Sequence, residues 1–248
     1  MAGESGLTFS NPKIQRLRRL LGRRSARSDE GVFVVEGEGL IEQAVAAGWE
    51  VEAQFVAPGG TPVDCAAPVH MLAPNVIERI ATTDSPRRVL ATVRHRDRPV
   101  PGGADLVVVG DRLADPGNVG TIIRSAEAVG AAAVVLTPGS VDAYSPKVVR
   151  STAGSVFRIP VVTGSLAEVR AMGLSLLGTS SHRGTSHTSA DLRRPVAVVV
   201  GNEAHGLADD ADVDEWITVH QPGPVECLNV AMATTVILFE VVRQRGER

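Results

Sequence analysis

Leu106-Val107-Val108-Val109-Gly110-Asp111-Arg112-Leu113-Ala114-Asp115-Pro116-Gly117-Asn118-Val119-Gly120 is the stretch of sequence that decides the fold class. The apolar run at 106–109 predicts a buried strand, and the turn residues after it lead into a helix that begins near Asn118. This alternation recurs to the end of the chain, with predicted strands at 132–136, 159–162, 175–178, 196–200 and 216–219, and helices beginning near 145, 165, 208 and 228. Such alternation predicts an α/β domain with a parallel sheet covered on both faces.

The first hundred residues predict a second, smaller α/β module. Residues 11–28 read as one basic helix, followed by a strand at 32–35, a helix at 36–47 and a strand at 51–57. Two further strands are expected at 69–72 and 89–93, with a helix at 74–81 between them. The run Arg98-Pro99-Val100-Pro101-Gly102-Gly103 has no periodicity and reads as a linker. We therefore expect an N-terminal domain at 1–98, a linker at 99–103 and a C-terminal domain at 104–248.

Composition narrows the class of protein. The chain has 248 residues, of which 44% are apolar and 21% charged, values typical of a folded globular protein. Only Cys65 and Cys227 are cysteines, which excludes a disulfide scaffold and a four-cysteine metal site. The N-terminus lacks the apolar core of a secretory signal, and the apolar run 230–242 is broken by threonines and a glutamate and is too short to span a bilayer. We expect a cytoplasmic protein with no membrane partner.

Basic residues cluster although the net charge is −3. Seven fall within fifteen positions that contain no acid: Lys13, Arg16, Arg18, Arg19, Arg23, Arg24 and Arg27. A second cluster lies at 87–98. Local basic density favours phosphate binding, so Arg18, Arg19, Arg23 and Arg24 are expected to contact RNA. The alternative is a solvated helix face, enriched in arginine in part because 23 of the 25 basic residues are arginine.

Three loops follow predicted strands, where ligands of parallel sheets bind. The first, 111–124, joins glycines to a helix start that offers free N–H groups to an anion. Asn118 and Arg124 are expected to border one pocket there, although Asn118 alone is equally explained as a helix N-cap. The loop contains neither G-x-G-x-x-G nor Gly-Lys-Ser/Thr. The other two loops are 200–207, which includes Gly201 and Glu203, and 221–230, which leads into the last helix.

The combination and order of these loops resemble the three motifs of the SpoU (TrmH-like) RNA methyltransferases. The matching residues are Asn118 to Arg124, Gly201-Asn202-Glu203, and Glu226-Cys227-Leu228-Asn229-Val230; upstream, Phe33-Val34-Val35-Glu36-Gly37 and Ser85-Pro86-Arg87-Arg88-Val89-Leu90-Ala91 are similar to the N-terminal substrate-binding module of that family. The resemblance implies a SPOUT-type domain with a deep trefoil knot, a rare topology. It also implies a homodimer, S-adenosylmethionine as methyl donor, and a ribose 2′-hydroxyl of structured RNA, expected to be ribosomal RNA, as acceptor.

The resemblance also implies roles for individual residues. Thr179, Gly201, Val219 and Leu228 would line the S-adenosylmethionine pocket, and Asn118, Arg124, Glu203 and Asn229 would be the catalytic group. Arg150 would hold an RNA phosphate. Cys227 stands where the family commonly has serine. Either sulfur merely replaces oxygen in a small residue at the helix entry, or the substitution changes how the substrate is positioned.

The chemistry limits what Arg124 can do. Methyl transfer from a sulfonium is an in-line displacement that requires alignment and loss of the hydroxyl proton. A guanidinium stays charged at neutral pH, so we expect Arg124 to stabilise the developing alkoxide rather than to act as the base. No metal is expected, because His182 and His187 lack a completing ligand pattern. The alternatives are a catalytically silent RNA-binding protein on the same fold and, less well supported, a nicotinamide-dependent oxidoreductase.

Overall fold

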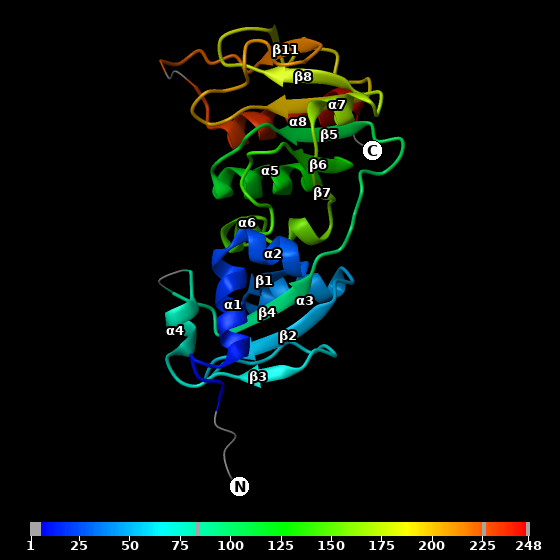
Figure 1. Cartoon of the computed structure of the whole chain (residues 1–248). Helices are drawn as coiled ribbons and strands as arrows, with labels where there is room; N and C mark the ends of the chain where they lie inside the picture. Colours follow the sequence, from blue (N-terminus) through cyan, green and yellow to red (C-terminus); the bar gives the residue numbers. More distant parts are fainter. Residues whose placement is uncertain (1–5, 83–84, 225–226, 247–248) are drawn as a thin grey trace. The chain divides into compact units, whose positions relative to one another are not determined.

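Contacts divide the chain into two compact units, each with its own sheet. The computed structural model describes residues 6–82, 85–224 and 227–246 (Figure 1). Unit 1 comprises Met1–Asp97 and Tyr144–Phe157, and unit 2 comprises Arg98–Ala143 and Arg158–Arg248. The first cut lies beside the predicted linker. The segment 144–157, by contrast, was expected in the C-terminal domain and is instead part of unit 1.

Unit 1 is built on a four-stranded sheet in the order β1-β4-β2-β3. Its strands are β1 (Val32–Glu36), β2 (Val51–Val56), β3 (Val69–Met71) and β4 (Val89–Arg94). Strand β4 is antiparallel to both neighbours, whereas β2 and β3 are parallel. The helices are α1 (Pro12–Gly22), α2 (Arg24–Glu30), α3 (Glu38–Ala46) and α4 (Val76–Ile80), together with α6 (Pro146–Ser151) and the short 3-10 helix η1 (Ser155–Phe157). The predicted strands and helices of residues 32–94 are confirmed to within two residues at each end.

The predicted basic helix at 11–28 is wrong as a single element. It breaks at Arg23, whose backbone is extended (φ −127°, ψ 121°), so that α1 and α2 are separate helices. The buried Arg27 guanidinium lies against the end of α1 and donates to the carbonyl oxygens of Leu20 (2.6 Å) and Leu21 (3.3 Å). The last carbonyls of a helix have no partner within the helix, and Arg27 satisfies two of them.

Aromatic packing explains why residues 144–157 belong to unit 1. The Tyr144 ring lies 4.9 Å from Phe33 and 4.3 Å from His95, measured between ring centroids. The Phe157 ring lies 5.6 Å from Trp49, and the Trp49 indole N–H donates to the Phe157 carbonyl oxygen at 2.9 Å. Aromatic pairs at these separations contribute about 0.5–1.5 kcal/mol each beyond the area they bury. Both ends of the segment are therefore anchored in the core of unit 1.

Unit 2 contains the predicted parallel sheet, with seven strands in the order β7-β6-β5-β10-β8-β11-β9. Every described pair in it is parallel. The strands are β5 (Leu106–Gly110), β6 (Ala133–Leu136), β7 (Val161–Thr163), β8 (Ser175–Thr179), β9 (Thr185–Ser186), β10 (Val196–Val200) and β11 (Glu215–Thr218). Helices α5 (Pro116–Ala128) and α8 (Val230–Arg245) pack on each other and against β5, β6 and β10. Helix α7 (Leu166–Arg170) contributes Val169 to the core cluster that includes Val107, Val109 and Val199.

One predicted helix of unit 2 is wrong, because residues 208–214 form turns and irregular backbone. This segment is rich in aspartate, which is a poor helix former because its short carboxylate competes for nearby backbone donors. Here Asp214 accepts from the Leu176 N–H at 2.8 Å and pairs with Arg170. The trefoil knot implied by the resemblance stays a prediction.

No helix in the described parts of the chain is both long enough and apolar enough to cross a membrane.

Candidate functional site

The loop between β5 and α5 is held by the start of its own helix. Asp115 is the N-cap of α5, and its carboxylate accepts from the Asn118 backbone N–H at 2.9 Å. Pro116 occupies the first helical turn, where a missing N–H costs nothing. The N-cap explanation for Asn118 is therefore wrong: Asp115 has that role, and the Asn118 side chain is left for other contacts.

Glu203, in the loop after β10, binds this β5–α5 loop. One of its carboxylate oxygens accepts from the Asp115 N–H and from the Asn118 side-chain amide, both at 3.0 Å. The other accepts from the Ala114 N–H, also at 3.0 Å. Burial by itself raises the pKa of Glu203, but these N–H donors together outweigh burial and lower the pKa below its usual value. Glu203 is thus an ionised acceptor of three N–H groups, and its lowered pKa makes it a poor proton acceptor.

Asn229 joins the same network from the start of α8. Its side-chain oxygen caps the helix by accepting from the N–H groups of Ala231 (3.0 Å) and Met232 (3.3 Å). Its amide nitrogen donates to the Asn118 side-chain oxygen at 2.9 Å. Glu203, Asn118 and Asn229 therefore form one continuous hydrogen-bonded row. These three residues lie far apart in the sequence and come from the three loops that the sequence pattern singled out.

Asn202 and Gly201 shape the turn that carries Glu203. The Asn202 side chain accepts from the N–H groups of Ala204 (3.0 Å) and His205 (3.3 Å), and donates to the Arg112 carbonyl oxygen at 2.8 Å. Gly201 cannot carry a side chain here, because a Cβ atom would lie 2.2 Å from the backbone of Gly206. The glycine is therefore required by the close approach of the loop to itself.

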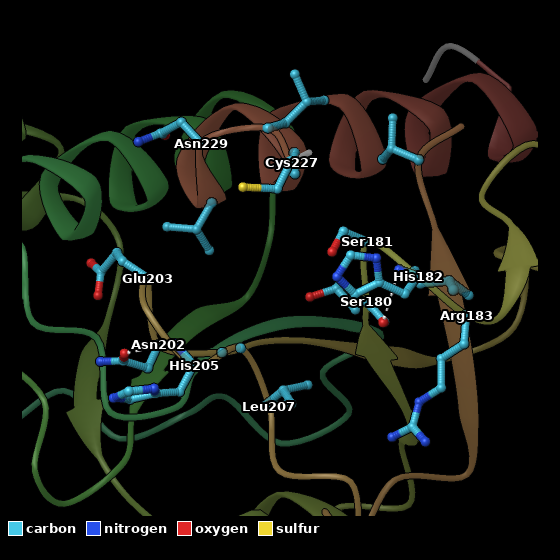
Figure 2. A pocket seen from close by; sticks show the side chains of 18 of the residues that line it. Ser180, Ser181, His182, Arg183, Asn202, Glu203, His205, Leu207, Cys227 and Asn229 are labelled. Carbon is cyan, nitrogen blue, oxygen red and sulfur yellow. Dashed lines mark hydrogen bonds between the residues drawn. The ribbon is translucent and has the colours of Figure 1, made fainter. Parts of the chain in front are cut away.

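A pocket of about 840 Å³ in unit 2 opens beside this row. It is lined by all four residues predicted to bind S-adenosylmethionine (Thr179, Gly201, Val219 and Leu228) and by Asn118, Glu203 and Asn229. In Figure 2 the labelled Asn202, Glu203 and His205 lie on one side of the pocket, and Ser180, Ser181 and His182 lie on the other. Pockets of roughly 300–1,000 Å³ are the usual size for small-molecule ligands.

One acceptor in the pocket is left without a donor by the residues that the structure describes. Gln221 lines the pocket, and among those residues its buried side-chain oxygen has no hydrogen-bond donor. A buried acceptor without a partner is costly, so a ligand that supplies an N–H or O–H group is favoured. S-adenosylmethionine carries such groups on adenine, ribose and the α-amino end, and the apolar side chains of Ile217, Val219 and Leu228 suit its remaining surface. The pocket therefore fits this group.

Sequence reasoning missed a cation–π contact on the pocket wall. The Arg183 guanidinium lies 3.8 Å from the centroid of the Trp216 indole and pairs with Asp209 at 3.0 Å. All three residues line the pocket. Nothing in the local sequence pairs an arginine before β9 with a tryptophan in β11, because the contact depends on strand order. Gln221 was missed for the same reason, although it lies in a loop that the sequence did single out.

Arg124 does not border the pocket, and this expectation was wrong. It is exposed on α5 and makes no hydrogen bond or ion pair with any residue that the structure describes. The six-residue spacing from Asn118 explains the difference. At about 100° per residue, six residues turn a side chain about 240° around the helix axis, so the two point to different faces.

The predicted RNA-contacting arginines of unit 1 fall into two classes. Arg18, Arg19, Arg23 and Arg24 are all exposed on or between α1 and α2, although Arg19 also forms an ion pair with Glu30 at 3.7 Å. Arg150 on α6 instead donates through one nitrogen to the buried Glu36 carboxylate (2.7 Å) and to the Thr82 hydroxyl (2.8 Å). Its charge is thus partly compensated within unit 1.

Neither His182 nor His187 belongs to a metal-ligand cluster: in the described residues no group of three or more His, Cys, Asp or Glu side chains is arranged to hold a metal ion.

Comparisons with known proteins identify the family. The model of the SpoU rRNA Methylase family matches residues 105–239, and that of the MRM3-like substrate binding domain matches residues 11–91. The chain is 30% identical over 246 residues to the 23S rRNA (guanosine(2553)-2′-O)-methyltransferase RlmP of Bacillus subtilis (strain 168), covering 93% of this chain and 96% of that one. It is 33% identical to the 23S rRNA (uridine(2479)-2′-O)-methyltransferase of Streptomyces viridochromogenes, covering 96% and 92%.

Solved structures agree with these relatives. The SpoU methyltransferase AviRb from Streptomyces viridochromogenes, in complex with AdoMet, matches with a TM-score of 0.86 at 32% identity, over 95% of this chain and 98% of that one. An AdoMet-bound rRNA methyltransferase from Sinorhizobium meliloti matches with a TM-score of 0.81 at 28% identity, over 94% and 95%. The predicted α/β fold and the family resemblance are confirmed. With one family model spanning more than half of its length and relatives aligned over nearly all of it, the chain belongs to the SpoU rRNA methylase family.

Proposed function

We propose that this chain transfers a methyl group from S-adenosylmethionine to a ribose 2′-hydroxyl of 23S ribosomal RNA. The observation that carries the proposal is the row Glu203–Asn118–Asn229 beside a pocket of small-molecule size. The relatives are named for this reaction, and two structural neighbours hold AdoMet. As an enzyme of ribosomal RNA, it acts in the cytoplasm.

The donor side of the reaction is the pocket. Thr179, Gly201, Val219 and Leu228 line it and hold the methyl donor, and the Gln221 oxygen accepts one of its N–H or O–H groups. When bound there, S-adenosylmethionine supplies an electrophilic methyl group on a sulfonium. The task of the protein is to align that methyl with the hydroxyl and to exclude water.

The acceptor side is the row of amides. Asn118 and Asn229 fix each other, and Glu203 fixes Asn118, so that the amides present constant donors and acceptors to the ribose without reorganising during the reaction. Glu203 is a positioning residue in this scheme, because its oxygens are committed to Ala114, Asp115 and Asn118. The ribose proton leaves to an acceptor other than Glu203.

A homodimer places Arg124 at the reaction. Helix α8 buries one face in unit 2 but exposes Met232 (59%), Val236 (41%) and Phe239 (53%), and Leu228 (38%) continues this apolar surface to the pocket. On α5, Ser125 bonds to Thr235 of α8 at 2.7 Å, so its neighbour Arg124 lies beside the α5–α8 contact. An interface between two copies is isologous, and each Arg124 then stabilises the developing alkoxide at the pocket of the other copy.

The RNA side involves unit 1. Arg18, Arg19, Arg23 and Arg24 are exposed for phosphate contacts. Glu36 and Thr82 hold one nitrogen of Arg150, and its side chain is 26% exposed, so the remaining N–H donors of the guanidinium are oriented for an RNA phosphate.

The test is transfer of a labelled methyl group to an unmodified 23S ribosomal RNA transcript, with mapping of 2′-O-methylation in the RNA of a deletion strain. We expect one ribose to be labelled in vitro and to lack its methyl in the strain. RNA binding without any transfer, together with an unchanged methylation map, would show instead a catalytically silent RNA-binding protein.

Sedimentation tests the dimer. We expect a species of twice the 26.0 kDa chain mass at micromolar concentration. Phe239→Glu and Met232→Glu should convert it to the monomer, because each places a charge in the apolar contact. A wild-type monomer would contradict the proposed position of Arg124.

A further inference from the structure

Several arginines of unit 1 are paired with acids of the same unit. Arg16 pairs with Glu30 (2.6 Å) and Glu52 (2.9 Å), and Arg94 pairs with Glu50 and Glu52. An arginine that is already paired with a carboxylate gains less from an RNA phosphate than one without such a partner. The arginines expected to gain most are those that the fold orders but leaves uncompensated.

Two arginines meet this condition around a single ring, Phe9. The Arg79 guanidinium carbon lies 3.6 Å from the ring centroid, and that of Arg18 lies 4.6 Å from it. Arg18 comes from α1 and Arg79 from α4, and both are exposed. Neither forms an ion pair with a residue that the structure describes.

The positions of both guanidinium groups are fixed by uncharged neighbours. The Phe9 ring packs against the apolar core of unit 1. Gln15 donates to the Phe9 carbonyl oxygen and accepts from an Arg18 nitrogen at 3.0 Å. One glutamine therefore holds both the backbone of Phe9 and the guanidinium of Arg18. A cation–π contact contributes about 0.5–1 kcal/mol at an exposed site, enough to favour one arrangement of a flexible arginine.

The two charges are close enough for one phosphate. Their distances to a common centroid place the two guanidinium carbons within about 8 Å of each other, the sum of the two distances. Two like charges this close repel each other, and an anion that contacts both guanidinium groups beside the ring lowers the repulsion and gains charge-assisted hydrogen bonds. Because Phe9 is partly buried and covered by guanidinium groups, the ring itself is no platform for a base.

We infer that Arg18 and Arg79, ordered by Phe9 and Gln15, form a phosphodiester-binding site for the RNA substrate on unit 1. The inference rests on the proposed function, which supplies RNA as the ligand, and adds Arg79 and Phe9 to the sequence-predicted arginines. Arg79 lies outside both basic clusters of the sequence, and only the packing of α4 near α1 brings it to Arg18.

The experiment measures binding of an unmodified 23S ribosomal RNA transcript by full-length variants over a series of salt concentrations. We expect Arg79→Ala and Arg18→Ala each to weaken binding about tenfold, a loss of about 1.4 kcal/mol. Both arginines are expected to bind the same phosphate. The double variant should therefore lower the slope of log affinity against log salt by about 0.7–0.9, which is the value for one phosphate contact and not two. Phe9→Leu keeps an apolar side chain but frees both guanidinium groups, so it should also weaken binding.

The matched control is Arg96→Ala. Arg96 is exposed, lies in the second basic cluster and donates only to the Ala47 carbonyl oxygen among the described residues. The Arg96→Ala variant removes one positive charge without affecting Phe9, and we expect its affinity for the transcript to change less than threefold. An equal loss in the Arg96 variant would overturn the inference, since any lost charge would then suffice. Wild-type affinity and salt slope in the Arg18/Arg79 double variant would overturn it as well.

Two further measurements separate this inference from the proposed function. S-adenosylhomocysteine affinity should be unchanged in all variants, and thermal melting should show each of them, including the core-contacting Phe9→Leu, to be folded at the assay temperature, which excludes unfolding. If the wild-type protein methylates the transcript and the double variant binds it normally, only the phosphate site is wrong. If the wild-type protein neither binds nor methylates the transcript, the proposed function is wrong too.

Discussion

The pocket of unit 2 and the basic surface of unit 1 satisfy their polar groups in opposite ways. Around the pocket, Glu203, Asn118 and Asn229 complete one another's hydrogen bonds. On unit 1, Arg18 and Arg79 are ordered by a ring and a glutamine and keep their charge available. Methyl transfer needs atoms held still before the substrate arrives, whereas phosphate binding needs charge that only the substrate neutralises. The first region should therefore be insensitive to salt and the second strongly sensitive.

Arg124 is an exception to this comparison, because it lies in unit 2 but keeps its charge available, like Arg18 and Arg79 of unit 1. It is a cation without an ion-pair partner among the described residues of unit 2, and we assign it to the reaction rather than to RNA affinity. Arg124→Ala should reduce methyl transfer by at least a thousandfold, since it removes the charge that stabilises the alkoxide. S-adenosylhomocysteine affinity, measured by calorimetry, should change less than threefold. A tenfold loss of that affinity would move Arg124 to the donor side.

Charge reversal on α1 and α2 should give the next largest effect. Changing Arg18, Arg19, Arg23 and Arg24 to glutamate should weaken binding of the 23S transcript about a hundredfold or more and flatten its salt dependence, because each lost phosphate contact removes about 0.7–0.9 from the slope. Filter binding at several salt concentrations measures this. The donor pocket lies in unit 2 and should keep its affinity for S-adenosylhomocysteine. An unchanged slope would mean that these arginines are a solvated face.

Gln221→Leu tests whether the buried Gln221 oxygen accepts a hydrogen bond from the ligand of the pocket. Removing the buried acceptor should weaken S-adenosylhomocysteine binding about tenfold, because a donor of the ligand then loses its partner. Repeating the titration with 5′-methylthioadenosine, which lacks the amino-acid end, shows which end makes the contact. Gln43→Leu in unit 1 is the control. Unchanged affinity for both ligands in the Gln221 variant would show that the oxygen faces water.

Glu240 on α8 should give the smallest effect, on stability. The hydrogen bond from Arg243 lowers its pKa from 4.5 to about 2. A depressed pKa stabilises the fold above the unfolded value, and the stabilisation is lost as pH falls from about 4.5 to about 2. Because Arg243 is largely exposed, we expect Glu240→Gln to cost only about 1 kcal/mol at pH 7. Urea unfolding at pH 7 and pH 2.5 measures it, and an equal loss at both would contradict the pKa.

The sequence predicted helices and strands well where apolar residues follow a regular pattern along the chain. The valine-rich strands of unit 2 appear within one or two residues of their expected bounds, because a strand buried on both faces reads as an unbroken apolar run. The failures are at polar segments. The aspartates at 209–214 were read as a helix, but Asp214 bonds to the N–H of Leu176, 38 residues away. The break at Arg23 was missed because it depends on Arg27 bonding back to the end of α1.

The candidate site was predictable in part. The carboxyl ends of parallel strands meet at one edge, which predicted that Asn118, Glu203 and Asn229 gather. The family resemblance supplied their roles, which stay predictions. Trp216 and Arg79 were invisible because each acts through a contact set by tertiary packing. Gln221 was invisible because tertiary packing also decides that it lines the pocket. The direction of the Arg124 side chain was predicted wrongly from its sequence spacing to Asn118. Counting about 100° per residue around α5 would have placed the two side chains on different faces of the helix.

The segment Tyr144–Phe157 determines when unit 1 can finish folding during translation. Phe33 and Trp49 are among the early residues to leave the ribosome, yet the rings that cover them, Tyr144 and Phe157, are made more than a hundred codons later. At about 5–20 residues per second this is a wait of many seconds. During it, the N-terminal module has an open aromatic core and Glu36 has no Arg150. Unit 1 is thus unfinished until about a third of unit 2 has been translated, which delays the maturation of its basic surface while the chain is still on the ribosome.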